Sequence, residues 1–156
     1  MKILITVGTT PFDKLIRFCD ENLDSVLAIT MQISNEANYI PKRFDYFKFT
    51  DDITSCYKSA DLVITHAGAG TIFTLLEMRK RIIVCPNLDR DDSHQEDLAG
   101  VVSRKKWGLV CWRYQDLPAL IVRAIEFTIL PYEHQEFFGG PFIDKIVRKL
   151  YFGVNQ

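Results

Sequence analysis

The segment with the strongest chemical signal is a glycine-rich turn between an apolar strand pattern, residues 61–65, and an apolar helical pattern. The turn, residues 66–71, reads His-Ala-Gly-Ala-Gly-Thr. Gly68 and Gly70 allow the backbone to bend sharply and to come close to a ligand. The first N–H groups of the following helix lack helical partners and carry its positive dipole end, and Thr71 adds a hydroxyl. The pattern predicts a metal-free diphosphate site, although a plain strand-to-helix connection can have the same composition.

A second loop, Gly8-Thr9-Thr10, follows the first apolar run of the chain. Gly8 permits a tight turn, and the hydroxyls of Thr9 and Thr10 can bond phosphate or sugar oxygens. The alternative is a structural role in which Thr10 caps a helix that begins after Pro11.

A third loop, residues 86–95, gathers polar groups just before another helical pattern. Gln95 offers both donors and acceptors, which suits a sugar or the edge of a uracil, and His94 can bond a phosphate or a hydroxyl. The alternative is a solvated acidic turn in which Ser93 caps the helix.

His66, directly before the glycines, can contact a ligand or hydrogen-bond the end of the sheet. Together with His94 and nearby aspartates it matches no zinc-ligand spacing, so no metal or other cofactor is expected, and no hydrolase triad can be identified. One rival interpretation is NAD binding, because the string that begins at Gly68 nearly fits G-x-G-x-x-G and Asp89 follows at a plausible distance. However, that fingerprint normally follows the first strand of its unit, and Phe73 occupies the position of the third small residue.

Strand and helix patterns alternate along the chain. Strands are predicted at residues 2–7, 25–31, 46–49, 61–65, 81–85 and 109–112. Helices are predicted around residues 12–23 and 53–57, the second capped by Asp51 or Asp52, and then at 71–79, 93–106, 116–129 and 142–152, with a break at 137–141.

This alternation predicts an α/β fold: a Rossmann-like, mainly parallel sheet with helices on both faces, in one domain spanning residues 1–156. Loops 8–11, 66–71 and 86–95 follow strands, so they are expected to face one cleft. The C-terminal helix, within residues 141–156, has an apolar stripe that packs either on a partner or on this domain's own core.

The chain has 156 residues, of which 47% are hydrophobic and 25% charged, and its net charge is −1. Such values are typical of a soluble domain and argue against a nucleic-acid partner. No apolar run approaches the roughly 20 residues of a membrane span. Four scattered cysteines without a CxxC pair, and an N-terminus without secretory features, predict reduced thiols and a cytoplasmic location.

Three segments, residues 5–16, 60–71 and 93–99, carry a family resemblance in their order along the chain. The strings VGTT and HAGAGT within them, taken together, are similar to the family 28 glycosyltransferase C-terminal domain. More narrowly, residues 1 to about 130 resemble the small subunit of split glycosyltransferases. These include the eukaryotic dolichol-linked N-acetylglucosaminyltransferase and bacterial pairs that build polysaccharides on undecaprenyl-diphosphate sugars.

The resemblance implies one half of a GT-B fold, the half that binds a UDP-sugar such as UDP-GlcNAc. The other half would be a membrane-anchored partner chain that recruits this one to the cytoplasmic face of the membrane. Residues 68–71, with Ala69 between the glycines, would hold the donor diphosphate, and His94 and Gln95 would contact the sugar or the nucleoside. Residues 8–10 would line the cleft that faces the partner and the acceptor.

One position departs from the family pattern. A glutamate usually stands three residues after the Ser/Thr of the glycine loop and grips the ribose, and this chain has Thr74 there. Glu77, one helical turn further on, either replaces it or leaves ribose binding weaker. No general base stands out, so Thr9, Thr10 and His66 are only cleft candidates for a catalytic role.

The expected function is a two-component inverting glycosyltransferase for exopolysaccharide, capsule or glycan biosynthesis. It would transfer a hexose or an N-acetylhexosamine to a polyprenyl-diphosphate-linked sugar. Two other classes stay open: a non-catalytic enhancer or regulatory subunit, and an NAD-dependent or nucleotide-sugar-modifying Rossmann enzyme.

Overall fold

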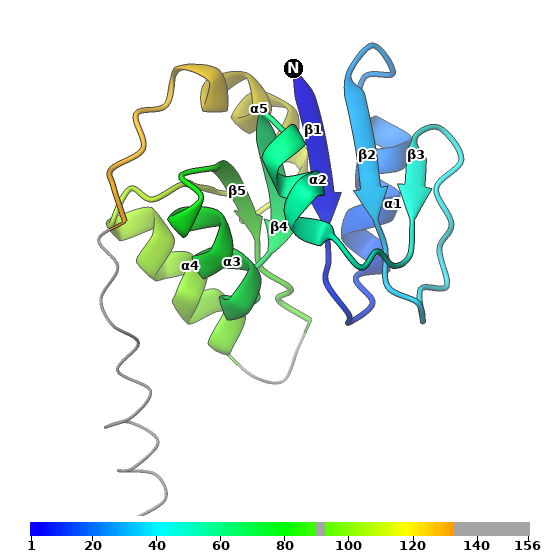
Figure 1. Cartoon of the computed structure of the whole chain (residues 1–156), viewed down its shortest axis with the longest axis horizontal. Helices are drawn as coiled ribbons and strands as arrows, with labels where there is room; N and C mark the ends of the chain where they lie inside the picture. Colours follow the sequence, from blue (N-terminus) through cyan, green and yellow to red (C-terminus); the bar gives the residue numbers. More distant parts are fainter. Residues whose placement is uncertain (90–92, 133–156) are drawn as a thin grey trace, which may run out of the picture.

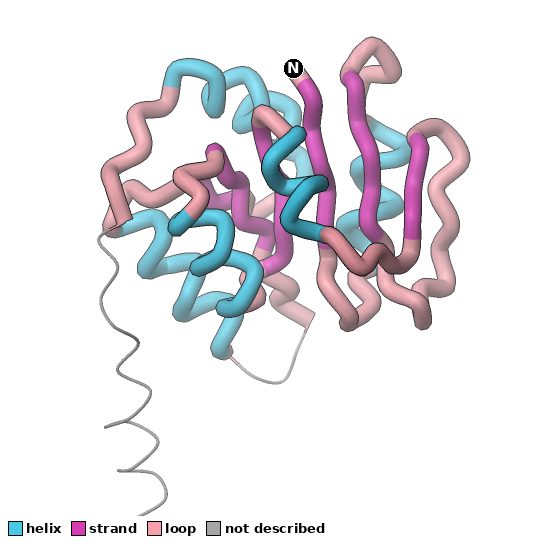
Figure 2. The backbone as a smooth tube through the Cα atoms, in the orientation of Figure 1, coloured by secondary structure: helices cyan, strands magenta, loops and turns pink. Residues whose placement is uncertain are grey.

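The computed structural model describes residues 1–89 and 93–132. Its centre is a sheet of six parallel strands in the order β3-β2-β1-β4-β5-β6 (Figures 1 and 2). The strands are β1 (Lys2–Thr6), β2 (Ala28–Gln32), β3 (Asp45–Phe47), β4 (Leu62–His66), β5 (Arg81–Cys85) and β6 (Leu109–Val110).

Helices cover both faces of this sheet, as Figure 1 shows. They are α1 (Asp13–Asn22), α2 (Ile53–Ser59), α3 (Ala69–Glu77), α4 (His94–Arg104), the 3-10 turn η1 (Tyr114–Asp116) and α5 (Leu117–Glu126). Helices α1 and α5 share one buried cluster with the sheet, and α2, α3 and α4 share the other. The Rossmann-like expectation of a parallel sheet between two helical layers is therefore confirmed.

Strand β4 shows why the two layers form. Leu62 and Ile64 belong to the cluster on the α1/α5 face, and Val63 belongs to the cluster on the α2/α3/α4 face. All three side chains are fully buried. A run of apolar residues without polar alternation is what a central parallel strand needs, because both of its faces are covered.

The connections leave β1 and β4 in opposite directions. The two strands are neighbours in the sheet, yet β1 leads to α1 on one face and β4 leads to α3 on the other. Their loops therefore separate at the carboxyl edge, the lower edge in Figure 1. Ligands of open α/β sheets bind in the crevice that such a change of direction creates.

Several strands begin or end at other residues than the sequence predicts. The second strand begins at Ala28 rather than at residue 25, because a turn at Asp24 holds the preceding residues and leaves Val26 81% exposed. The third strand is residues 45–47 rather than 46–49, and the sixth ends at Val110. The fifth strand, residues 81–85, is confirmed in full.

The helix boundaries also differ from the pattern. Helix α3 begins at Ala69, two residues before the predicted start, and α4 spans 94–104 rather than 93–106. The segment predicted as a helix from residue 116 is η1 followed by α5, which ends at Glu126. Asp52, one of the two predicted caps, accepts a 2.9 Å hydrogen bond from the Ser55 N–H, so it caps α2.

The predicted break at 137–141 and the helix at 142–152 lie outside the described residues. Among the helices that the structure does describe, none is long and apolar enough to cross a membrane.

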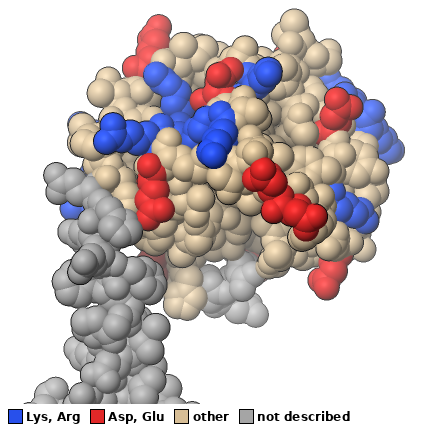
Figure 3. Space-filling model, in the orientation of Figure 1, with Lys and Arg blue, Asp and Glu red and all other residues tan. Residues whose placement is uncertain are grey.

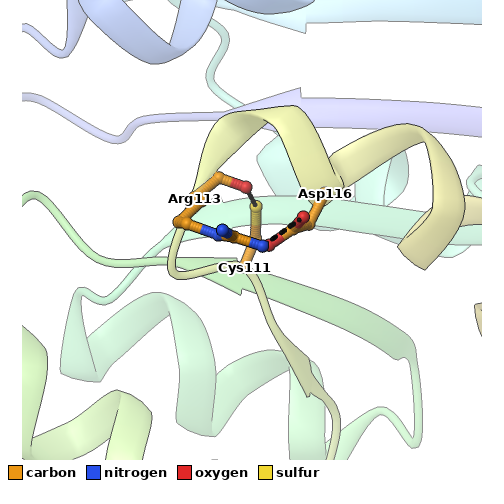
Figure 4. Close-up of polar contacts among 3 residues, drawn as sticks. All are labelled: Cys111, Arg113 and Asp116. Atoms are coloured by element: carbon orange, nitrogen blue, oxygen red, sulfur yellow. Dashed lines mark hydrogen bonds and ion pairs between the residues drawn. The ribbon is translucent and has the colours of Figure 1, made fainter.

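The turn between β6 and α5 is closed by polar contacts that Figure 4 shows. The Cys111 thiol donates to the Arg113 carbonyl at 3.1 Å, and the Arg113 guanidinium makes two contacts of 2.9 and 3.0 Å to the Asp116 carboxylate. Because this ion pair is exposed, it adds little to the stability of the fold and mainly fixes the entry to α5. All four cysteines are free thiols, and three of them are buried.

A buried carboxylate anchors the long connection between β2 and β3. Asp20, on α1, is 1% exposed and accepts hydrogen bonds from the Tyr39 hydroxyl at 2.7 Å and from the N–H groups of Lys42 and Arg43, each at 2.9 Å. Burial by itself would raise the pKa of Asp20, but these hydrogen bonds hold the pKa below its ordinary value.

Asp20→Asn is therefore expected to lower the free energy of unfolding by about 2 kcal/mol or more at pH 7, because an amide cannot accept from both backbone donors. A carboxylate with a lowered folded-state pKa stabilises the fold above its unfolded pKa, roughly 3.9, and loses that contribution as the pH falls through the folded pKa. Urea unfolding of wild type and Asp20→Asn, at pH 7 and below pH 4, should thus show a difference in the free energy of unfolding that is smaller at the lower pH. The exposed neighbour change Glu21→Gln should have little effect at either pH.

Candidate functional site

The glycine turn after β4 is shorter than the sequence suggests. Gly68 is the N-cap of α3, in an extended conformation with φ −83° and ψ 123°, and the first helical hydrogen bond runs from the Ile72 N–H to the Gly68 carbonyl at 3.0 Å. Ala69, Gly70 and Thr71 therefore form the first turn of the helix. Their N–H groups precede the first intrahelical donor, and Gly68 has no side chain to cap them.

The His66 imidazole lies between the two glycine loops. A Cβ placed on Gly68 would be 2.2 Å from His66 Nε2, and one placed on Gly8 would be 3.0 Å from His66 Cε1. His66 is half-buried, and its Nδ1 lies 3.5 Å from the Thr65 hydroxyl. Gly8 and Gly68 are thus needed to accommodate this ring, and His66 joins the loop after β1 to the loop after β4.

Gly70 differs from Gly68. A Cβ on Gly70 would have no atom within 4 Å, and Gly70 itself is exposed. No neighbour in the described chain therefore requires glycine at this position. A glycine in a first helical turn costs stability relative to alanine, so its use here fits a site where a ligand approaches the backbone.

The loop after β1 adopts a conformation that favours glycine. Gly8 has φ +67°, in the left-handed region. Its N–H donates to Gln32 Oε1 at 3.0 Å, and its carbonyl accepts from Gln32 Nε2 at 3.0 Å. Thr9 and Thr10 are exposed at the tip of this loop, and the Thr9 carbonyl accepts from the Ser34 hydroxyl at 2.7 Å.

Thr71 is tied to the sheet through Tyr57 of α2. Burial raises the pKa of the Tyr57 phenol, and side-chain hydrogen bonds with Thr71 and Thr6 act in the opposite direction. Tyr57 is 5% exposed. The Tyr57 side chain thus lies between the end of β1 and the first turn of α3.

Further along α3, the Thr74 hydroxyl donates to the Gly70 carbonyl at 2.8 Å. Thr74 stands at the position of the family's glutamate, and its hydroxyl hydrogen is already donated to the preceding turn of the helix. Glu77 is exposed and lies three residues later, about 4.5 Å further along the helix axis. Phe73 packs against Tyr132 with ring centroids 5.7 Å apart, as part of the core beneath α3.

The third loop is fixed at its start. Gln95 Oε1 accepts from the Asn87 N–H at 2.9 Å, so this side chain joins the beginning of α4 to the residue after Pro86. Asp89 forms a 2.7 Å ion pair with Lys14, which links the third loop to the start of α1. His94 is exposed at the first position of α4, and the Ser93 hydroxyl bonds Asp97 rather than capping the helix.

A cavity of about 220 Å³ opens at the carboxyl edge beside the first of these loops, and none of the described residues of 66–71 or 86–95 is in its lining. Its walls come from the ends of β1 and β2, from the segment after β3 and from α2, and its lining residues are Thr6, Gly8, Thr9, Gln32, Asn35, Lys48, Phe49, Thr50, Ile53 and Tyr57. Sequence reasoning singled out only Gly8 and Thr9 among them. The segment 48–50 was missed because it was predicted to be largely strand, whereas it follows β3 as a loop.

Two other surface features lie away from this edge. A larger cavity of about 600 Å³ is lined by residues at the beginnings of strands, such as Lys2, Ala28 and Asp45. On the face in Figure 3, the largest group of lysine and arginine side chains lies over the upper part, which is the amino edge of the sheet.

Within residues 1–89 and 93–132, no group of three or more His, Cys, Asp or Glu side chains is placed to hold a metal ion. The glycine turn that resembles a dinucleotide fingerprint follows β4, whereas that fingerprint normally follows the first strand. The arrangement therefore suits a ligand at the crevice between β1 and β4.

The parallel sheet, its two helical layers and the glycine loops at the switch between β1 and β4 define a Rossmann-like domain. The sequence model described as "Glycosyltransferase family 28 C-terminal domain" matches residues 2–136. The chain belongs to this glycosyltransferase family, which confirms the resemblance.

Two relatives illustrate the sequence similarity. The chain is 32% identical over 112 residues to the UDP-N-acetylglucosamine transferase subunit ALG13 of Mus musculus, covering 63% of this chain and 10% of that protein. It is 39% identical over 71 residues to the UDP-N-acetylglucosamine--N-acetylmuramyl-(pentapeptide) pyrophosphoryl-undecaprenol N-acetylglucosamine transferase of Prochlorococcus marinus (strain MIT 9215), covering 46% of this chain and 18% of that protein. The chain thus spans less than a fifth of the length of either relative.

Two solved structures share the fold. The crystal structure of Acinetobacter baumannii MurG matches with a TM-score of 0.66 at 18% identity, over 96% of this chain and 52% of that one. The NMR structure of ALG13 matches with a TM-score of 0.61 at 18% identity, over 97% of this chain and 96% of that one. At this identity the likeness establishes the architecture, which is one half of a GT-B fold.

Proposed function

We propose that this chain is the donor-binding subunit of a two-chain inverting glycosyltransferase, with UDP-GlcNAc as the best-supported donor. The observation that carries the proposal is the first turn of α3. It is uncapped and open at Gly70, and it lies beside the crevice between β1 and β4 of a family 28 domain. The relatives' names add the donor: both describe N-acetylglucosamine transferases, and one describes a subunit.

The diphosphate would bind at the N–H groups of Ala69, Gly70 and Thr71. These three donors and the positive end of the α3 dipole attract an anion, and the absence of a side chain at Gly70 lets phosphate oxygens come close. His66 and the Gly8–Thr10 loop would form the side of the site that faces the partner and the acceptor.

The nucleoside would occupy the cavity of about 220 Å³. The cavity is small, which suits a pyrimidine nucleoside better than a dinucleotide, and Phe49, 70% exposed beside it, offers an aromatic face for a base. The ribose would be held without the family's usual glutamate, since the Thr74 hydroxyl bonds the Gly70 carbonyl; Glu77 is the next acid along α3. His94 and Gln95, at the start of α4, would approach the sugar.

In the proposed reaction, a hydroxyl of a polyprenyl-diphosphate-linked sugar attacks the anomeric carbon of the donor. The new C–O bond forms as the bond to the departing UDP breaks, and the α3 N-terminus stabilises the negative charge that develops on UDP. The proton of the attacking hydroxyl passes to a base on a membrane-anchored partner chain, which also binds the acceptor. The partner would hold this chain at the cytoplasmic face of the membrane.

The test is calorimetric titration of the purified chain with UDP, UDP-GlcNAc, UDP-glucose and UDP-galactose, in buffer containing EDTA. We expect UDP to bind without metal and UDP-GlcNAc to bind more tightly than the other two sugars. With a polyprenyl-diphosphate-linked sugar added as acceptor, the chain co-expressed with its membrane partner should transfer sugar, and the isolated chain should not.

Other results would point to other functions. If the isolated chain binds no UDP-sugar, while the pair binds and transfers it at a site that changes in this chain do not affect, this chain is a regulatory subunit. Turnover by the isolated chain would contradict the split-enzyme proposal. Binding of NAD in place of UDP would favour the Rossmann dehydrogenase alternative.

A further inference from the structure

Gln32 is an unusual residue for its position. It ends β2, it is 7% exposed, and its amide is one of the few polar side chains buried in the described part of the chain. A buried amide costs free energy unless its hydrogen bonds are satisfied, so an apolar residue would be the simpler choice here.

The Gln32 amide is satisfied by two loops that are distant in sequence. Its Oε1 accepts from the Thr6 hydroxyl at 2.6 Å and from the Gly8 N–H at 3.0 Å. Its Nε2 donates to the carbonyls of Gly8 at 3.0 Å, Ile33 at 2.9 Å and Lys48 at 3.3 Å. Gly8 belongs to the loop after β1, and Lys48 belongs to the loop after β3.

The position of β2 in the sheet makes this double contact possible. Strand β2 lies between β1 and β3, so a side chain at its carboxyl end is within reach of the loops that follow both neighbours. Both loops line the cavity of about 220 Å³, and so does Gln32. A single amide therefore holds both of these parts of the lining.

The contacts also orient the backbone of each loop. In a trans peptide the carbonyl and the following N–H point in opposite directions. Because the carbonyls of Gly8 and Lys48 point at Gln32, the N–H groups of Thr9 and Phe49 point away from it. Without the amide, both peptides would be able to rotate.

We infer that Gln32 is a positioning residue that holds the Gly8 loop and the Lys48 loop at the spacing and peptide orientation required for binding at this cavity. It acts through the two loops, and it has no assigned contact with the donor. That Gln32 matters for ligand binding rests on the proposed donor site. That Gln32 orders the two loops rests on the hydrogen bonds alone.

The test uses the full chain with Gln32→Leu, which keeps the bulk and removes every hydrogen bond, and Gln32→Glu, which keeps one accepting oxygen and replaces the donating amide. Asp20→Asn is the matched control, because Asp20 is also a buried polar anchor but does not line the cavity. Two readouts are taken: amide hydrogen exchange of peptides covering residues 8–12 and 48–52, and affinity for UDP by calorimetry.

We expect Gln32→Leu to speed exchange in both loops at once and to weaken UDP binding by about tenfold or more. Gln32→Glu should do the same, because its second oxygen would face the carbonyls of Gly8 and Lys48 as another acceptor. Asp20→Asn should destabilise the whole protein while leaving UDP affinity and exchange in the two loops close to wild type. That split separates a positioning role from general loss of stability.

The inference is overturned if the two loops exchange at the wild-type rate in the Gln32 variants, or if UDP affinity falls equally in Asp20→Asn at matched stability. If the wild-type chain binds no UDP, the proposed donor site fails, and the exchange data still decide whether Gln32 orders the loops. If Gln32→Leu does not fold, Gln32→Glu carries the same comparison.

Discussion

Gly68→Ala is expected to lower the free energy of unfolding by about 1–3 kcal/mol, the usual cost of forcing an extra methyl group into a packed site. The new Cβ would lie 2.2 Å from His66 Nε2, well inside contact distance. The His66 ring also lies close to the backbone of Gly8, on the other loop, where an added Cβ would be 3.0 Å from it. The clash therefore has to be relieved by moving the imidazole or by opening the junction between β4 and α3.

Gly70→Ala is the matched control, two residues away on the same turn. Its Cβ would meet nothing within 4 Å, and the position lies inside α3, where alanine is favoured over glycine. The free energy of unfolding of Gly70→Ala should therefore rise by up to about 1 kcal/mol. In urea unfolding, the midpoint should be lower than that of wild type for Gly68→Ala and higher for Gly70→Ala.

A rescue experiment identifies the cause of the Gly68 effect. If the clash with the ring is responsible, His66→Ala combined with Gly68→Ala should recover most of the loss that Gly68→Ala causes alone, as a double-mutant cycle measures. A Gly68→Ala protein as stable as wild type would show that the His66 ring moves aside without cost, and it would refute the role assigned to Gly68.

This pair of glycines shows what the sequence could reveal and what it could not. The string predicts a glycine turn at the end of a strand, and the structure confirms it. The string gives both glycines the same role, approach to a ligand. In the structure Gly68 makes room for His66, and only Gly70 faces open space. That difference depends on the rotamer of His66 and on its packing against Gly8, 58 residues earlier, which no local pattern contains.

The start of α3 was missed for a related reason. Glycine has a low helix propensity, so the periodic pattern predicts a helix that begins at Thr71. In the structure the helix already includes Ala69 and Gly70. The N–H groups that precede the first intrahelical donor are therefore those of residues 69–71, within the segment 68–71 to which the resemblance assigns the diphosphate.

The sequence does not predict that Gln32 and the segment 48–50 line a cavity, because that role depends on the order of the strands in the sheet. The second strand was predicted to end at Met31, and nothing in the chain indicates that β2 lies between β1 and β3. Strand and helix patterns identify elements with buried faces well. They do not identify a side chain whose partners are 24 and 16 residues away.

Gly70→Asp is expected to leave the fold intact and to weaken UDP binding by about 100-fold or more, the scale of like-charge repulsion at close range in a partly buried site. The two effects have opposite signs for one physical reason. An aspartate in the first turn of a helix interacts favourably with the dipole and stabilises the fold by about 0.3–1 kcal/mol. The same carboxylate occupies the place, and carries the charge, that the donor diphosphate would bring.

Gly70→Asn separates charge from bulk, because it has nearly the same shape as aspartate without the charge. We expect Gly70→Asn to weaken UDP binding less than Gly70→Asp, and the ratio of the two affinities should shrink as salt screens the charge. Calorimetry at low and high ionic strength, with unfolding curves for each variant, checks both statements. Equal UDP affinity in wild type and Gly70→Asp would show that the diphosphate does not bind at the α3 N-terminus, because a carboxylate among the N–H donors would repel an anion bound there. The donor would then have to bind elsewhere along the carboxyl edge, with α3 serving only as a helix of the fold.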